Sequence, residues 1–182
     1  MLTLIVVLTI LGLGLAGWYT ARARARLLYT GRDSMHSMPT YHGWHMALWV
    51  VVPALLAWVV WSGIAPGLIE SAVLSDPAAA QLPASEMERH AVMAEASAMA
   101  SNPDAVAFNP LASALAEPMR AAQWRFGLIG AAIVALFGFV GGAYGYTRVR
   151  AGFPARTQVE RAIMLLLLAA SLMAILTTFG IV

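Results

Sequence analysis

Three of the four histidines lie close together in the sequence, and their spacing could support metal or haem chemistry. His42 and His45 are three residues apart, which puts both on one face of a helix; His36 precedes them, and His90 lies far along the chain. Imidazole is a common metal ligand and an axial ligand of haem. These residues stand at the edge of an apolar segment, however, and not inside it. We therefore expect interfacial histidines without metal or cofactor and a solvent-exposed His90; a haem- or metal-binding membrane subunit is the alternative.

Other chemistry-bearing patterns are absent from the sequence. Without cysteine there can be no disulfide, thiolate metal site or cysteine nucleophile. The sequence contains no phosphate loop, catalytic serine triad, paired-carboxylate site or nucleic-acid-binding motif. An ionisable residue deep in a membrane helix would be a functional candidate, but Glu70 and Arg125 stand only at segment ends. We expect no enzyme, no cofactor and no nucleic-acid partner.

Four long apolar segments make up most of the chain and must position any functional residues. They run over residues 2–18, 44–69, 126–146 and 162–182. A bilayer core about 30 Å thick requires about 20 apolar helical residues. The whole chain is 60% hydrophobic and 11% charged, against about 25% charged in a soluble domain. The sequence predicts an all-α polytopic membrane protein with four transmembrane helices and membrane lipid as its surroundings.

A polar insert separates the second and third apolar segments. The predicted organisation is residues 1–70 for the first two transmembrane helices, 71–122 for an acidic insert rich in alanine and proline, and 123–182 for the last two helices. Ser85 and Glu88 fit a capping box ahead of a helix over 86–100, and a second short helix is expected near 111–121. The chain stops at Val182, still within apolar residues, so we expect a truncated C-terminus.

Arginines set the expected orientation, because loops rich in arginine stay in the cytoplasm. The insert is acidic, and positive charge concentrates in the loop after the first segment, residues 19–43, and in the loop before the last segment, residues 147–161. The positive charge follows the first segment, which is opposite to a cleaved signal peptide. We expect a bacterial inner membrane protein with a periplasmic N-terminus and a periplasmic insert. The arginines that define this topology are Arg22, Arg24, Arg26, Arg148, Arg150 and Arg156.

Glycines in the third segment predict close helix packing. Gly138 and Gly142 are four residues apart, and so are Gly141 and Gly145. Small residues at this spacing let two helix backbones approach closely in a membrane. The pattern favours packing against the first or second segment of the same chain, with dimerisation as the alternative.

A stretch before the second segment resembles a known family. Residues 35–49 are similar to the N-terminal region of the PstC family of phosphate ABC-transporter permeases, in the longer form that has an additional N-terminal membrane domain. The family pattern is close to leucine-His-Ser-x-Pro-x-Tyr-x-Gly-Trp-x-x-Ala-Leu-Trp, and Met35 here replaces the leucine. Residues 156–161 and 169–182 look like the family's next membrane entry. The motif residues matched are His36, Pro39, Tyr41, Gly43, Trp44 and Trp49.

The resemblance implies an accessory membrane domain of an importer permease, structural or regulatory and without the transport core. In this family the core lies downstream of the matched region, and no phosphate-contacting residue can be assigned to this chain. The implied partners are a second permease subunit, a cytoplasmic ATPase and a periplasmic phosphate-binding protein, reached through that missing core. The alternative is a stand-alone small inner-membrane anchor or assembly subunit of another complex.

Overall fold

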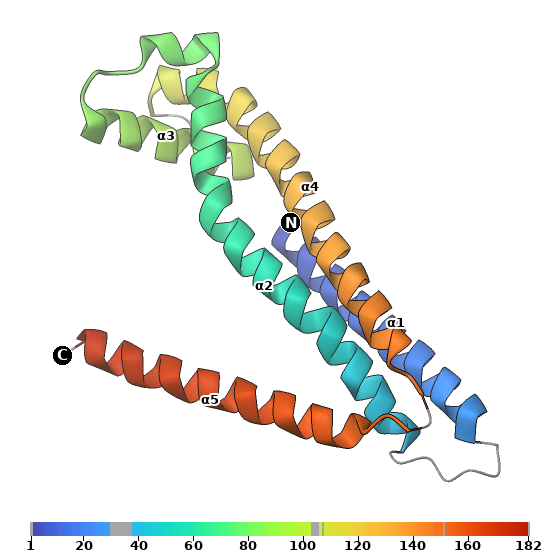
Figure 1. Cartoon of the computed structure of the whole chain (residues 1–182). Coiled ribbons are helices and arrows are strands. Elements are labelled where there is room, and N and C mark those ends of the chain that lie inside the picture. Colours follow the sequence, from blue (N-terminus) through green and yellow to red (C-terminus); the bar gives the residue numbers. More distant parts are fainter. Residues whose placement is uncertain (1, 30–37, 103–105, 107, 151, 182) are drawn as a thin grey trace. The chain divides into compact units, whose positions relative to one another are not determined.

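Helices account for the regular structure in the part of the chain that the computed structural model describes, namely residues 2–29, 38–102, 106, 108–150 and 152–181. Four of them are long: α1 (Leu2–Tyr29), α2 (Pro39–Leu74), α4 (Pro110–Thr147) and α5 (Ala155–Ile181). The shorter α3 (Glu86–Ser101) and the 3-10 helix η1 (Pro77–Gln81) lie between α2 and α4 in the chain (Figure 1). All four long helices are apolar and long enough to cross a membrane, which confirms the predicted all-α membrane fold.

The helices are longer than the apolar segments that predicted them. α1 continues through the Arg-Ala repeat to Tyr29. α4 spans 38 residues, about 57 Å at 1.5 Å per residue, or nearly twice the thickness of a bilayer core. The separate short helix expected near 111–121 is wrong, because these residues form the first turns of α4. The helix continues through Pro118, and the alanines on both sides of that proline favour helix.

The structure divides into two units, and α2 and α4 each contribute to both. The first unit comprises residues 1–57 and 134–182, and the second comprises residues 58–133. These boundaries fall inside α2 and α4, which run without a break past residues 70 and 122.

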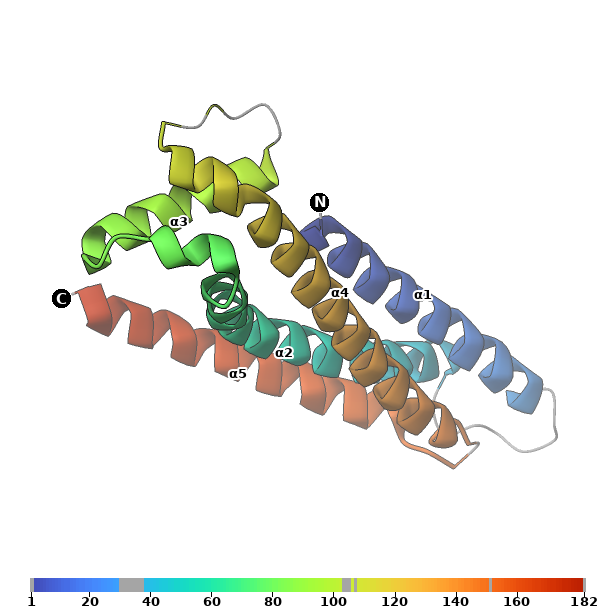
Figure 2. The same ribbon diagram turned by 90° about the horizontal axis from the view of Figure 1, so that it is seen from above.

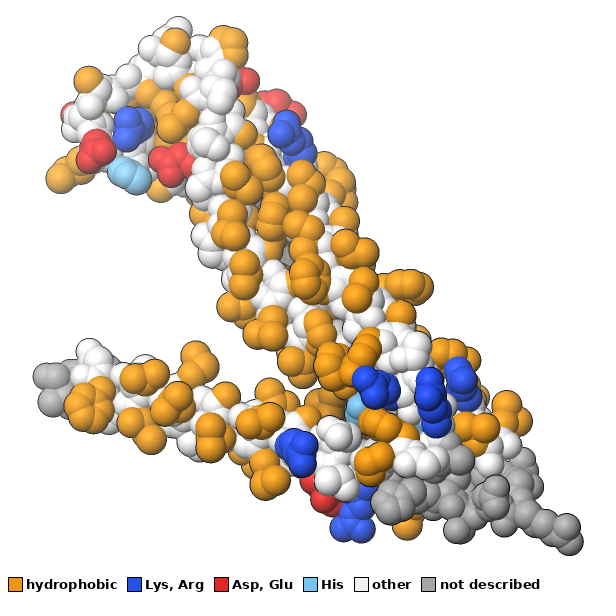
Figure 3. All heavy atoms as spheres, viewed as in Figure 1, with side chains coloured by type: hydrophobic (Ala, Val, Ile, Leu, Met, Phe, Trp, Pro, Cys, Tyr) orange, Lys and Arg blue, Asp and Glu red, His pale blue; other side chains and the backbone are white. Residues whose placement is uncertain are grey.

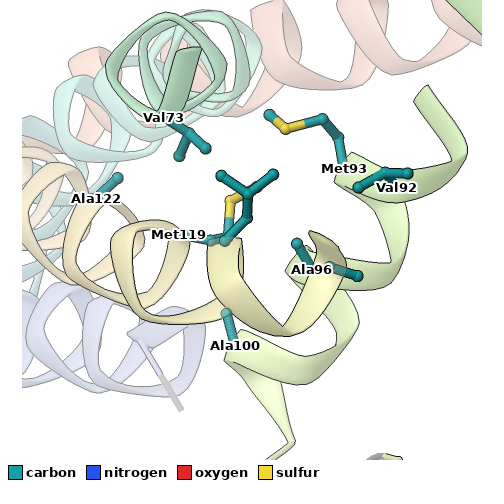
Figure 4. Close-up of a cluster of buried hydrophobic side chains, with 9 residues drawn as sticks. Val73, Val92, Met93, Ala96, Ala100, Met119 and Ala122 are labelled. Atoms are coloured by element: carbon teal, nitrogen blue, oxygen red, sulfur yellow. The ribbon is translucent and has the colours of Figure 1, made fainter. Parts of the chain in front are cut away.

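The second unit has its own small hydrophobic core. It confirms the helix predicted over 86–100, here α3, which lies beside the first turns of α4 (Figure 2). Alanines at the contacts let the helices approach closely, and methionines fill the remaining space (Figure 4). The buried residues are Val73 from α2, Val92, Met93, Ala96 and Ala100 from α3, and Ala112, Leu115, Met119 and Ala122 from α4.

Polar contacts tie the loops of the second unit to its helices. The Glu95 carboxylate accepts hydrogen bonds from the backbone N–H groups of Phe108 and Asn109, and Asp76 caps η1 by accepting from the N–H of Ala78 at 2.9 Å. The predicted capping box is wrong: Ser85 is the N-cap of α3, but its side chain makes no capping hydrogen bond. Its extended backbone instead places the Ser85 carbonyl as the first acceptor of the helix, 3.0 Å from the N–H of Arg89.

The core of the second unit predicts a clear difference between two truncations. Leu115 is 1% exposed and Met87 is 83% exposed. Replacing a buried leucine with alanine costs about 2–5 kcal/mol, because it removes apolar contact and leaves a cavity. Leu115→Ala should therefore accelerate tryptic cleavage at Arg89 in the purified protein, whereas Met87→Ala should leave the cleavage rate near that of the parent. Equal rates for the two variants would show that this core does not hold α3 in place.

Candidate functional site at the arginine-rich end

Residues 39–49 of the stretch that resembles a known family form the first turns of α2, and a short link between α4 and α5 covers them. Hydrogen bonds from the N–H of Val149 to the Tyr146 carbonyl and from that of Phe153 to the Arg150 carbonyl hold the link in consecutive turns. Val149 is 1% exposed and belongs to a cluster with Ala21, Ala25 and Met46. We call this region of the first unit the arginine-rich end: the last turns of α1, the first turns of α2 and α5, and the link 148–154.

His42 and His45 are buried inside the first unit, which the sequence analysis did not predict. They are 1% and 6% exposed, because the Phe153 ring packs on both imidazoles at centroid distances of 6.2 and 4.9 Å. Trp49 donates its indole N–H to Nε2 of His45 over 3.1 Å. That hydrogen bond occupies the lone pair a metal would need. His42 Nε2 is buried and has no hydrogen-bond partner among the described residues.

The other histidines do not join this pair. His36 lies outside the described residues, and His90 is exposed on α3 as expected. Within the described ranges no group of three histidine, aspartate or glutamate side chains could hold a metal ion. The structure therefore brings together two histidines of the three considered for a metal site, and it surrounds them with aromatic rings.

Motif residues in the first turns of α2 contact both α1 and α4. Pro39 is the first residue of α2, where its missing N–H costs no hydrogen bond. A Cβ at Gly43 would lie only 2.9–3.0 Å from the Trp18 ring and carbonyl on α1, so glycine permits this contact. Trp18 in turn meets the Trp44 ring edge-on at 6.5 Å. On the other side, Trp49 contacts the Tyr144 ring of α4 at 4.4 Å.

The four glycines that the sequence analysis singled out in α4 face α2 and α1. A Cβ at Gly141 would collide with the Trp49 carbonyl of α2, and one at Gly142 would come within 3.0 Å of the Val50 side chain. A Cβ at Gly145 would lie 3.3 Å from the Met46 Cα. At Gly138 it would lie 3.4 Å from Leu13 on α1 and 3.6 Å from the Cβ of Ala54. In the structure these four glycines lie at contacts between helices of the same chain.

Figure 3 shows basic side chains gathered at this end, and several of these arginines lie over aromatic rings. Four arginines make cation–π contacts, in which the guanidinium carbon lies over the face of a Trp or Tyr ring. Arg148 also donates to the Tyr144 hydroxyl at 2.8 Å, and Arg156 donates to Glu160 at 2.7 Å. The remaining topology arginines, Arg26 and Arg150, are exposed. The ring pairs are Arg22 with Trp18 at 4.8 Å, Arg24 with Tyr146 at 4.2 Å, Arg148 with Tyr144 at 4.9 Å and Arg156 with Tyr41 at 5.9 Å.

Sequence reasoning missed the residues that complete this end. Phe153 and Val149 lie in the link, and the other residues of that link are arginine, alanine, glycine and proline. Two apolar residues in so short and charged a segment are the signal that could have found them, since exposed links seldom require large apolar side chains. Trp18 was also missed, because its contact with Gly43 depends on the position of α1 beside α2.

Comparison with known proteins identifies a family for this chain. A family model described as "Phosphate ATP-binding cassette transporter" matches residues 7–177, nearly the whole chain. No curated protein and no solved structure matches it.

The close approach of α4 to α2 predicts that one added methyl group will be costly. Gly141→Ala would place its Cβ against the Trp49 carbonyl, which is backbone and cannot rotate away. At Gly12 on α1 a Cβ meets nothing within 4 Å, and alanine there improves helix propensity by up to about 1 kcal/mol. In detergent, Gly141→Ala should lower the midpoint of thermal unfolding, followed by tryptophan fluorescence, while Gly12→Ala should not. A Gly141→Ala midpoint equal to that of the parent would contradict the contact.

Proposed function

The chain belongs to the phosphate ATP-binding cassette transporter family, and from that premise we propose that it is the N-terminal accessory membrane domain of a phosphate import permease. The role is structural or regulatory; the domain is not an enzyme, binds no cofactor and does not itself conduct phosphate. The observation that carries the proposal is the match over residues 7–177 to a chain whose apolar segments contain no Asp, Glu, Lys or Arg. A phosphate path would require arginines or helix N-termini within the bilayer.

The proposed setting is the inner membrane of a bacterium, with the arginine-rich end in the cytoplasm. This follows from the asymmetry of arginine between the loops. Tryptophan and tyrosine side chains favour the interface between membrane and water. Four arginines lie over such rings at this end, namely Arg22, Arg24, Arg148 and Arg156. In this orientation α3 and the N-terminus lie in the periplasm, on the side from which a phosphate-binding protein would approach.

The partners proposed are a second permease subunit, an ATPase and the phosphate-binding protein, joined through a transport core outside these residues. α5 offers the most surface for contact with such a core. Every residue of α5 from Ile163 to Gly180 is exposed, whereas α1, α2 and α4 each bury residues within their apolar spans. Only its first turns are packed, through Ala155 and Val159, so most of the helix is free to meet lipid or another subunit.

Crosslinking in native membranes tests the proposal. A photo-reactive amino acid would replace Met173 on α5, which is 71% exposed, or, as the control, Leu15 on α1, which is 67% exposed. We expect the Met173 position of the full-length protein to capture a permease or ATPase subunit of the phosphate importer in cells grown on limiting phosphate, and to do so more than the Leu15 position. Purification without any transporter subunit from either position would favour a stand-alone anchor or assembly subunit.

A further inference from the structure

A groove in the first unit lies between the first turns of α5 and the adjoining face of α2. Its volume is about 230 Å³. From α2, Leu48, Val52 and Pro53 provide an apolar wall, and Leu165 of α5 faces them. Gln158 and Arg161 of α5 also line it.

The groove changes from polar to apolar along its length. On α2 the lining residues run from His45 to Pro53, and on α5 from Gln158 to Leu165. Both helices begin at the arginine-rich end, so the polar residues of the two walls lie at the same end. Eight residues of helix rise about 12 Å, which is somewhat less than half the thickness of a bilayer core. These dimensions and this polarity match the upper part of one lipid acyl chain beneath its headgroup.

Arg161 stands at the polar end without a carboxylate partner among the described residues. The neighbouring Glu160 pairs with Arg156 at 2.7 Å, on the preceding turn of the helix. Arg161 is the last charged residue before the apolar stretch of α5. A guanidinium at the edge of an apolar span is stabilised by an anion, and a phosphate group can accept two parallel hydrogen bonds from it. Gln158, one turn earlier, adds an amide donor.

We propose that this groove binds one anionic phospholipid, with its phosphate at Arg161 and Gln158 and an acyl chain along Leu48, Val52 and Leu165. Basic pockets between membrane helices near the interface bind anionic headgroups in this way. The apolar wall favours a lipid over a free anion, because inorganic phosphate would gain nothing from that part of the groove. The proposal does not rest on the transport role and holds in either membrane orientation.

Native mass spectrometry of the full-length protein can count bound lipids and tests the proposal. The probes are phosphatidylglycerol, phosphatidylethanolamine with identical acyl chains, and inorganic phosphate. The parent protein should retain phosphatidylglycerol in preference to phosphatidylethanolamine. Arg161→Gln should weaken phosphatidylglycerol binding about tenfold, equivalent to about 1.4 kcal/mol. Arg161→Lys should recover part of the loss, because it restores the charge but not the paired hydrogen bonds.

Two further variants separate the site from general surface charge. Arg26→Gln removes the same charge from an exposed residue of the arginine-rich end that does not line the groove, and it should leave lipid binding unchanged. Ala162→Phe places a large side chain in the groove and should weaken the binding of both phospholipids. Equal losses in Arg26→Gln and Arg161→Gln would overturn the proposal, as would equal retention of the two lipids by the parent. Displacement of the lipid by inorganic phosphate would instead indicate a site for the free anion.

Discussion

The contact on which the first unit depends is the approach of the α4 backbone to the backbone of α2. In a bilayer, apolar side chains gain little by leaving lipid for protein, so helices associate through close packing of small residues. Gly141 against the Trp49 carbonyl and Gly145 against the Met46 Cα provide that packing. A side chain at either position would push α4 outward and separate the rings of Tyr144 and Trp49, now 4.4 Å apart.

The arginine-rich end is built on this contact. With α4 held against α2, its last turn directs the link so that Phe153 lies on His42 and His45 and Val149 reaches Met46 and Ala21. The link then starts α5 next to α2, which forms the groove between Leu48 and Leu165. The residues that resemble a permease family are therefore packing residues: Gly43 admits Trp18, and Trp49 joins His45 to Tyr144.

The sequence was sufficient to predict the spans and the helix of the insert, because each depends on local composition. Apolar segments of about 20 residues marked the crossings, and the Ala-Met-Glu run marked α3. The ends of the helices were harder to predict. The Arg-Ala repeat carries no signal that ends α1, which continues to Tyr29. Pro118 does not interrupt the helix either, so α4 begins at Pro110, well before its apolar segment. The burial of His42 and His45 was beyond sequence reasoning, because Phe153, which covers them, is distant in the chain. Glycine spacing likewise predicts a close contact but cannot choose the partner helix.

A disulfide between α2 and α4 tests the central contact most directly, and the chain has no cysteine of its own to interfere. A Cβ at Gly138 would lie 3.6 Å from the Ala54 Cβ, within the range of about 3.5–4.5 Å that disulfides require. Ala54→Cys with Gly138→Cys should therefore crosslink rapidly in membranes under mild oxidation. The control pair, Leu56→Cys with Val140→Cys, replaces side chains that are 61% and 59% exposed and should stay reduced. Failure of the first pair, or equal crosslinking of both, would contradict this packing of α4 on α2.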